Sequence, residues 1–120
     1  MSRQSHATNQ YLTELIQHLK KTAIEQKVNI WKALATELEK PARIRRVVNI
    51  ERINRFCDDK ETIVVPGKVL GVGALDKSLT VAAFSFSESA SQKINQKGKT
   101  LTIEELIKMN PKGSKVRIIG

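Results

Sequence analysis

Apolar residues recur every three or four positions through the first forty residues, and this spacing predicts two helices. The first is expected to begin at Thr8 or Asn9, either of which can cap it, after a polar segment, residues 1–7, that we expect to be disordered. Asn29 is a candidate cap for the second helix, which ends before Pro41 because the residue preceding a proline is pushed out of the helical region. The predicted core-facing residues are Leu12, Leu15, Ile16, Leu19 and Ala23, then Trp31, Leu34, Ala35 and Leu38.

The next stretch changes from an extended pattern to a short helix. Residues 42–48 are predicted to be extended, and Asn49 is a candidate cap for the helix that follows. The apolar residues expected to fix this stretch to the core are Ile44, Val47, Val48, Ile50, Ile53 and Phe56.

The second half alternates β-branched runs with capping-box patterns, which predicts strands and helices in turn. A strand is expected over Thr62–Val65, closed by Pro66 and Gly67, with a further extended piece over 68–70. The remaining predicted elements are a strand over Leu79–Ala83, a helix opened by the box Ser85–Glu88 and ended near Gln96 with Gly98 as a left-handed cap, a short strand at Leu101, a helix opened by the box Thr102–Glu105 and ended at Met109, and a strand over Lys115–Ile119.

This order of elements favours an α/β fold with at least some parallel strand pairing. We expect a helical and arginine-rich N-terminal extension over residues 1–60 and an α/β core over residues 61–120, together forming one structural unit.

Five of the seven arginines lie within thirteen residues in the middle of the chain, with Glu51 as the one acid among them. Arginine presents a planar fork of donors that fits a phosphate, and its weak hydration allows partly buried contacts. A charge run is often only a solvated surface, but a nearly acid-free arginine block favours polyanion binding. The predicted phosphate-binding residues of this block are Arg43, Arg45, Arg46, Arg52 and Arg55.

The charge and composition narrow the classes of partner. The net charge is +9 and the pI is about 9.9, with basic residues in excess in both halves of the chain, which favours RNA, DNA or an anionic membrane surface. The apolar runs are far shorter than the ~18 residues of a membrane span, and the polar first ten residues do not resemble a secretory signal. The single cysteine, Cys57, excludes an internal disulfide and suggests a reducing, intracellular location. Aromatic residues make up only 4%, which argues against an aromatic platform for single-stranded bases.

The lysines of the second half are dispersed, and many are expected only to aid solubility. Lys68, beside Pro66 and Gly67, and the pair Lys97 and Lys99, around Gly98, are the better candidates for phosphate contacts. Small neighbouring residues would let a phosphate backbone approach closely.

Motifs for catalysis and cofactor binding fail on inspection. Gly71–Gly73 would need a third glycine at position 76 to bind a dinucleotide, but Asp76 stands there. Gly98–Thr100 imitates the end of a P-loop, but Lys93 occupies the place of its first glycine. The two histidines lack partners at metal-ligand spacing, and Cys57 is predicted to be a buried thiol. We therefore expect no enzymatic activity, no cofactor and no metal site.

Seven segments, taken in order and with their spacing, resemble archaeal members of the large-subunit ribosomal protein eighteen-e family, relatives of bacterial large-subunit ribosomal protein fifteen. The resemblance covers nearly the whole chain from Asn9 onward. The matching segments are Asn9–Leu12, Lys40–Ile53, Val65–Gly71, Leu79–Ala83, Phe86–Ala90, Thr100–Leu106 and Asn110–Ser114.

The resemblance implies a cytoplasmic structural ribosomal protein that binds large-subunit ribosomal RNA (rRNA) as a monomer within the subunit. It implies an irregular β-β-α superhelix with an N-terminal helical extension, and neighbouring large-subunit proteins as partners, ribosomal protein four among them. The family's basic block corresponds to Arg43, Arg45, Arg46 and Arg52, and its proline-glycine-lysine motif places Lys68 in the same role.

The resulting hypothesis is that the protein stabilises folded rRNA by neutralising phosphates, with recognition of shape more than of base sequence. Two alternatives remain open from the residues alone. One is a free-standing factor that binds DNA or transfer RNA, and the other is a basic adaptor that binds acidic proteins.

Overall fold

Helices and strands follow one another along the chain in the computed structural model, which describes residues 3–41 and 46–120, with side chains from Gln10 onward. The elements of this part are α1 (Arg3–Gln26), α2 (Ile30–Leu38), β1 (Arg46–Asn49), α3 (Ile50–Phe56), β2 (Thr62–Leu70), β3 (Thr80–Phe86), α4 (Glu88–Asn95), β4 (Lys99–Thr102), α5 (Ile103–Met109) and β5 (Val116–Ile118).

All the strand pairs of the sheet are parallel, and β2 is its longest strand. On one edge β2 pairs with β3, which pairs in turn with β4. On its other edge β2 pairs with β5 over Thr62–Val64 and then with β1 over Gly67–Leu70. Pro66, which lacks an amide hydrogen, lies where the partner changes. The prediction that Pro66 and Gly67 close the strand is therefore wrong, because β2 continues through an irregularity between Val65 and Lys68.

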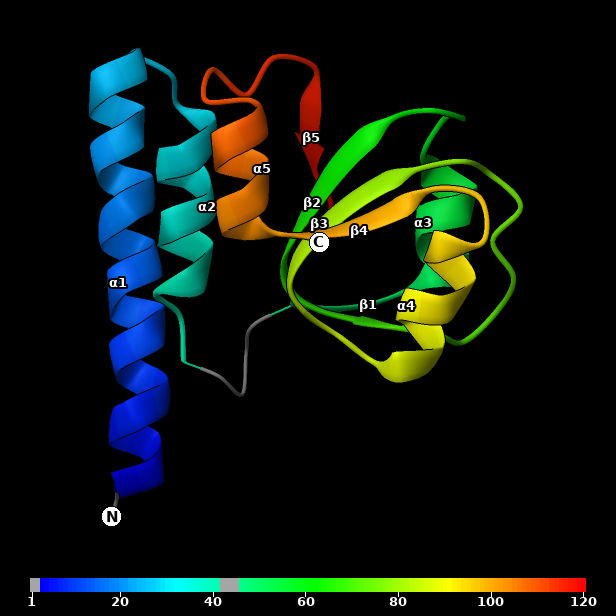
Figure 1. Ribbon diagram of the computed structural model, residues 1–120, viewed down its shortest axis with the longest axis horizontal. Coiled ribbons are helices and arrows are strands. Elements are labelled where there is room, and N and C mark those ends of the chain that lie inside the picture. Colours follow the sequence, from blue (N-terminus) through cyan, green and yellow to red (C-terminus); the bar gives the residue numbers. More distant parts are fainter. Residues whose placement is uncertain (1–2, 42–45) are drawn as a thin grey trace.

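Helices cover both faces of the sheet (Figure 1). Alternate residues of β2 point to opposite sides, so Val64 packs with α1, α2 and α5, whereas Ile63 and Val65 pack with α3 and α4. The same alternation in β3 sends Ala82 to the first side and Val81 to the second. The predicted α/β fold with parallel pairing and an N-terminal helical part is confirmed. The division of the chain near residue 60 stays a prediction.

The two N-terminal helices carry the predicted buried stripe. All the core-facing residues named for them are buried except Ile16, which is partly buried. The indole of Trp31 is fully buried, and its Nε1 donates a hydrogen bond to the carbonyl oxygen of Pro111, at 2.6 Å.

The predicted start of the first helix is wrong, because α1 begins at Arg3 rather than at Thr8 or Asn9. Extension of an existing helix costs little when neither proline nor glycine interrupts it, so the prediction of disorder fails for residues 3–7. Residues 1–2 lie outside the described part.

The predicted capping box is confirmed for α5, whereas the N-cap of α4 is a different serine from the one predicted. Glu105 N donates to Thr102 Oγ1 at 3.0 Å, and Thr102 N donates to Glu105 Oε1 at 2.8 Å, so both bonds of the predicted capping box form. The cap of α4 is Ser87, whose hydroxyl accepts from the amide of Ala90, and not Ser85. Strand β3 extends through Phe86 and holds Ser85 within it.

Asn29 and Asn49 occupy the predicted N-cap positions of α2 and α3, but neither side chain accepts a hydrogen bond from its helix. The prediction of a left-handed cap at Gly98 is wrong, because the glycines with positive φ are Gly73 and Gly113. A side chain at Gly98 is excluded for another reason: its Cβ would lie 1.9 Å from the carbonyl oxygen of Leu79.

Candidate nucleic-acid interface

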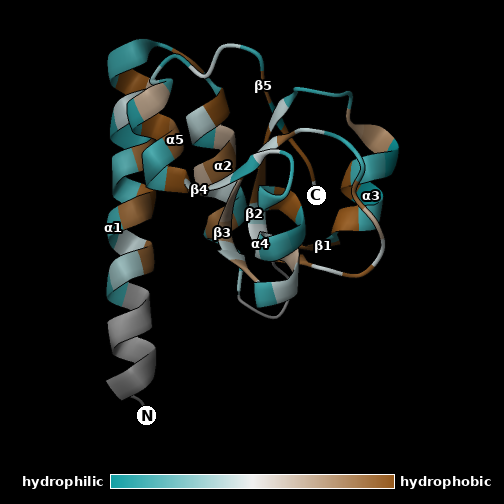
Figure 2. Cartoon of the chain, turned by 45° about the vertical axis from the view of Figure 1, so that its right-hand side comes forward, coloured by the Kyte–Doolittle hydropathy of each residue, from teal (hydrophilic) through white to brown (hydrophobic). Residues whose placement is uncertain are grey.

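A surface of two arginines and one aromatic ring lies on α3, and we call Arg52, Arg55 and Phe56 the α3 surface. These residues are exposed, whereas Ile50 and Ile53 on the opposite side of the helix are fully buried against the sheet. Because residues three and four apart are neighbours on a helix, Arg52 adjoins both Arg55 and Phe56. Figure 2 shows hydrophilic and hydrophobic residues together on α3. The buried side anchors the helix and thereby fixes the direction of the arginines.

The guanidinium of Arg52 has two contacts that restrict its movement. It lies over the ring of Phe56, with Cζ 5.2 Å from the ring centroid, and its Nη2 donates to the carbonyl oxygen of Gly120 at 3.3 Å. Arg55 forms no hydrogen bond or ion pair with any described residue, so its charge remains available to a partner. Arg52 is thus held in place while Arg55 is free to adjust.

Arg46 lies near Arg52 because both contact the same residue. A Cβ built on Gly120 would lie 3.0 Å from Arg46 Nε, and Arg52 Nη2 donates to the carbonyl oxygen of Gly120, so both side chains lie near this residue. Arg46 Nε is also 3.6 Å from a carboxylate oxygen of Glu37, which offsets part of its charge. Arg46 and Arg52 thus lie close to the same residue, and their role in binding a polyanion stays a prediction. Arg43 and Arg45 lie outside the described residues.

Two apolar residues of this stretch are not buried as predicted. Val48, Ile50 and Ile53 lie in the core, but Val47 is 61% exposed and Phe56 is 52% exposed. On a strand the neighbours of a buried residue point to the other side, and on α3 only one side faces the sheet. Ile44, the remaining residue of that prediction, lies outside the described part.

Lys68 is exposed on β2, in register with the exposed Val47 of β1. The neighbouring Gly67 does not leave room for a phosphate, because a Cβ there would lie 1.9 Å from the carbonyl oxygen of Arg46. Gly67 is required for the close approach of β1 to β2. The physical reason given for choosing Lys68 is therefore wrong, although the residue itself stays a candidate.

Lys97 and Lys99 lie at the turn from α4 to β4, and both are exposed. Lys97 Nζ donates to the carbonyl oxygen of Asp76 at 3.3 Å, and the amide of Asp76 donates to Asn54 of α3. The loop between β2 and β3 therefore connects this turn to α3. The space in the Cβ direction of Gly98 is filled by Leu79, as described above, so Gly98 is required there by the protein's own backbone.

Three cations that the sequence could not distinguish from solvated ones bind the protein itself. Lys77 donates to the carbonyl oxygens of Asn54 and Cys57, and Lys93 donates to those of Gly71 and Gly73. Arg117 forms a two-point ion pair with Glu61, with 2.8 Å from its Nε to Oε2 and 2.8 Å from its Nη2 to Oε1. The hydrogen bond to Glu61 raises the pKa of Arg117 above its ordinary value. These cations support the loops around α3.

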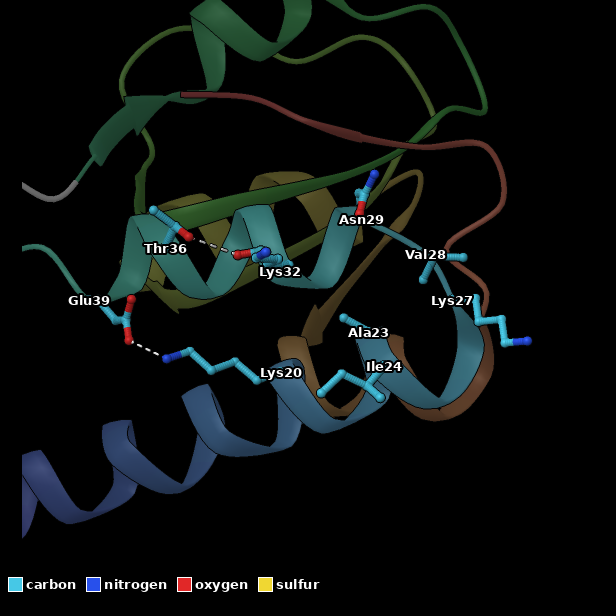
Figure 3. A pocket seen from close by; sticks show the side chains of 9 residues that line it. All are labelled: Lys20, Ala23, Ile24, Lys27, Val28, Asn29, Lys32, Thr36 and Glu39. Atoms are coloured by element: carbon cyan, nitrogen blue, oxygen red, sulfur yellow. Dashed lines mark hydrogen bonds and ion pairs between the residues drawn. The ribbon is translucent and has the colours of Figure 1, made fainter.

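A second basic region, which sequence analysis missed, is the groove between α1 and α2 (Figure 3). Its volume is about 630 Å³, and its apolar part includes Ile24, which is 76% exposed. Lys20 is paired across the groove with Glu39 at 2.6 Å, whereas the ammonium groups of Lys27 and Lys32 have no hydrogen-bond or ion-pair partner among the described residues. Lys20 and Ile24 lie four residues apart and so share one side of α1, and Lys27 follows directly after the end of the helix. This spacing is a signal that could have revealed the groove.

The side chains with catalytic potential have structural surroundings. Cys57 is buried, as predicted, and burial is the main cause that raises the pKa of its thiol above the ordinary value, so the reactive thiolate is disfavoured. Among the side chains that the structure describes, those of residues 10–41 and 46–120, no group of three histidine, cysteine, aspartate or glutamate residues is arranged to hold a metal ion. No helix in this part of the chain is long and apolar enough to cross a membrane.

The fold and its arginine-bearing surface are those of a small basic α/β protein, and comparison with known proteins gives its family. The family of ribosomal proteins that includes 50S-L15 and 50S-L18e, together with a 60S member, matches residues 12–102. The chain belongs to this family of ribosomal proteins.

Several archaeal relatives are similar over almost their whole length. The chain is 52% identical over 120 residues to the large ribosomal subunit protein eL18 of Methanoregula boonei, covering 99% of each chain. It is 46% identical to the protein of the same name from Methanospirillum hungatei, again covering 99% of each, and 47% identical over 112 residues to that of Haloarcula marismortui, covering 93% of this chain and 97% of the relative. The resemblance found from the sequence segments is confirmed.

Proposed function

We propose that the protein is a structural constituent of the large ribosomal subunit and that it binds and stabilises folded large-subunit rRNA. The observation that carries this proposal is the α3 surface, where Arg52 is held by a ring and Arg55 has no partner within the described chain. An arginine that is held as Arg52 is loses little conformational freedom when it binds a phosphate. Membership of a ribosomal protein family supports the same conclusion. A place in the subunit carries with it a cytoplasmic location and neighbouring ribosomal proteins.

The phosphate contacts are assigned to exposed cations of α3 and of the sheet and its turns. Arg46 and Arg52 both lie near Gly120, and Arg55 adjoins Arg52 on the helix. Lys68, Lys97 and Lys99 are exposed and are included as further candidates. Arg43 and Arg45 are included on the sequence argument alone. Contacts of this kind orient a protein on RNA without reading its sequence, so recognition rests on the shape of the folded RNA.

The test is sedimentation of a cell lysate through a sucrose gradient at low salt and then at high salt, followed by detection of the protein. We expect near-stoichiometric amounts in the large-subunit fractions, retained at moderate salt. A variant with Arg52→Ala and Arg55→Ala should leave these fractions at lower salt than a variant with Lys27→Ala and Lys32→Ala, which removes the same charge from the groove. If the wild-type protein stays at the top of the gradient, the ribosomal assignment is wrong, and a free nucleic-acid-binding factor takes its place.

A further inference from the structure

The exposed ring of Phe56 is the feature of α3 that phosphate binding does not use. Phe56 is 52% exposed, whereas Trp31 is fully buried and Phe84 and Phe86 are partly buried. Tyr11, at 46% exposed, is paired with the ring of Phe84 at 5.9 Å between centroids. Single exposed apolar residues are common on proteins, so exposure alone implies no role. What distinguishes Phe56 is its contact with an arginine.

The ring of Phe56 carries a cation over it and is still about half exposed. Arg52 Cζ lies over the ring at 5.2 Å from its centroid, and Phe56 remains 52% exposed. A guanidinium over an aromatic ring is an attractive arrangement that restricts the movement of both groups. The hydrogen bond from Arg52 to the carbonyl oxygen of Gly120 restricts the guanidinium further.

The backbone that carries the ring is fixed by three separate contacts. Arg117 Nη2 donates to the carbonyl oxygen of Phe56 at 2.7 Å, and Lys77 binds the carbonyl oxygens of Asn54 and Cys57. The side chain of Cys57 is buried directly after Phe56. A ring held in this way needs little ordering when it binds a flat ligand, which reduces the entropic cost of the complex.

The charges around the ring favour an anionic ligand. Arg52 and Arg55 are exposed on the same side of α3 as the ring, and Arg55 has no partner within the described residues. Of the acids that follow, Asp59 accepts a hydrogen bond from the amide of Ser78, and Glu61 is paired with Arg117. Asp58 is exposed, but it lies beyond the C-terminal end of the helix, whereas a helical side chain leans toward the N-terminus and carries the ring toward Arg52.

We propose that Phe56 and Arg52 bind one unpaired nucleotide of the RNA, with its base stacked on the exposed ring and its flanking phosphate on Arg52 and Arg55. An unpaired nucleotide combines a flat apolar base with a negative charge one sugar away, and this matches a ring beside two guanidinium groups. The proposal rests on the function proposed above and adds a base contact to it. It also reverses the expectation, drawn from the low aromatic content, that base stacking plays no part.

The test is 2′-hydroxyl acylation of rRNA in large subunits from cells whose only copy of the protein is wild type, Phe56→Ala or Phe56→Tyr. Stacking of a base on an aromatic side chain contributes about 1–3 kcal/mol, so loss of the ring should raise the reactivity of one or two unpaired nucleotides by at least about fivefold. Phe56→Tyr keeps the ring and should retain the wild-type pattern. Val72→Ala, at a residue that is 62% exposed, is the matched control for loss of apolar surface without a ring.

The outcomes separate the two proposals. If wild-type protein is absent from the subunits, the proposed function fails and the base contact fails with it. If the Phe56→Ala protein is present in normal amounts and no nucleotide changes, only the base contact is wrong. A change of equal size in Phe56→Tyr or in Val72→Ala would also overturn it, because the effect would then not come from the ring. Arg52→Lys keeps the charge but removes the planar guanidinium, and it should raise the acylation reactivity of the same nucleotides by a smaller factor than Phe56→Ala.

Discussion

The α3 surface and the groove between α1 and α2 are both basic, but they hold their charges in different ways. On α3 the cations are arginines, one of them stacked on Phe56, and the helix beneath them is anchored by two fully buried isoleucines. In the groove the cations are lysines, one of them already paired with Glu39, and an exposed Ile24 lies among them. The α3 surface therefore has an oriented cation, Arg52, on a firmly anchored helix, whereas the groove has lysines held by at most one exposed ion pair.

This difference bears on what each region can contribute to RNA binding. A lysine ammonium is strongly hydrated and sits on a flexible stem, so it adds to the general attraction of the protein for a polyanion. A planar guanidinium that is already oriented can form two parallel hydrogen bonds to a phosphate at a smaller entropic cost. We therefore expect the α3 surface to contribute more affinity per charge than the groove.

The largest expected effect is on the anchoring of α3. Ile53→Ala removes a fully buried side chain beneath the α3 surface and should lower the free energy of unfolding by about 2–5 kcal/mol. Ile24→Ala in the groove, where the side chain is 76% exposed, should change it by less than about 0.5 kcal/mol. Urea denaturation of both variants measures the difference, and similar values for the two would show that α3 is no better anchored than the groove.

The second effect compares equal reductions of charge. Arg52→Ala with Arg55→Ala should weaken binding to deproteinised large-subunit rRNA about tenfold more than Lys27→Ala with Lys32→Ala, because arginine–phosphate interactions are charge-assisted and can be bidentate, and because Arg52 is already oriented. The slope of log affinity against log salt should fall by about 0.7–0.9 for each phosphate that the variant no longer neutralises. Filter binding at several salt concentrations measures both quantities. Equal weakening by the two pairs would mean that only net charge matters.

A smaller effect concerns the ion pair across the groove. Glu39→Gln removes the partner of Lys20, and since the pair is exposed the free energy of unfolding should fall by less than about 1 kcal/mol. The released charge should strengthen rRNA binding by a small factor that disappears as salt screens it. Thermal denaturation and salt-dependent binding check the two parts. A large decrease in stability would mean that the groove is held more firmly than its exposure indicates.

The smallest effect is a pH dependence of the free energy of unfolding that comes from Cys57, the buried residue directly after α3. Burial raises the pKa of Cys57 in the folded protein above its unfolded value, so the folded state keeps a proton that the unfolded state loses. The resulting stability is fully present below the ordinary thiol pKa of about 8.5 and falls as pH rises above it. Urea denaturation between neutral and alkaline pH should show a steeper decline for wild type than for Cys57→Ala. Identical declines would assign no part of the pH dependence to this thiol.

The apolar spacing of the sequence determined most of the local structure. The stripe from Leu12 to Ala23, the buried side of α2 and the capping box at Thr102 follow from side-chain periodicity and from hydrogen bonds between residues three apart. The same is true of the arginine block, because density of charge along the chain is a property of the sequence itself. The family was also recognisable at this level, from the order and spacing of seven segments.

Only the tertiary structure decided which of these residues are covered and which approach one another. The exposure of Phe56, the meeting of Arg46 and Arg52 at Gly120, and the internal use of Lys77, Lys93 and Arg117 all depend on contacts between residues distant in sequence. Gly67 and Gly98 likewise make room for the protein's own backbone and not for a phosphate. Periodicity gives the side of an element that tends to be apolar, but burial requires a second element to pack against it, and that partner is supplied by the fold as a whole.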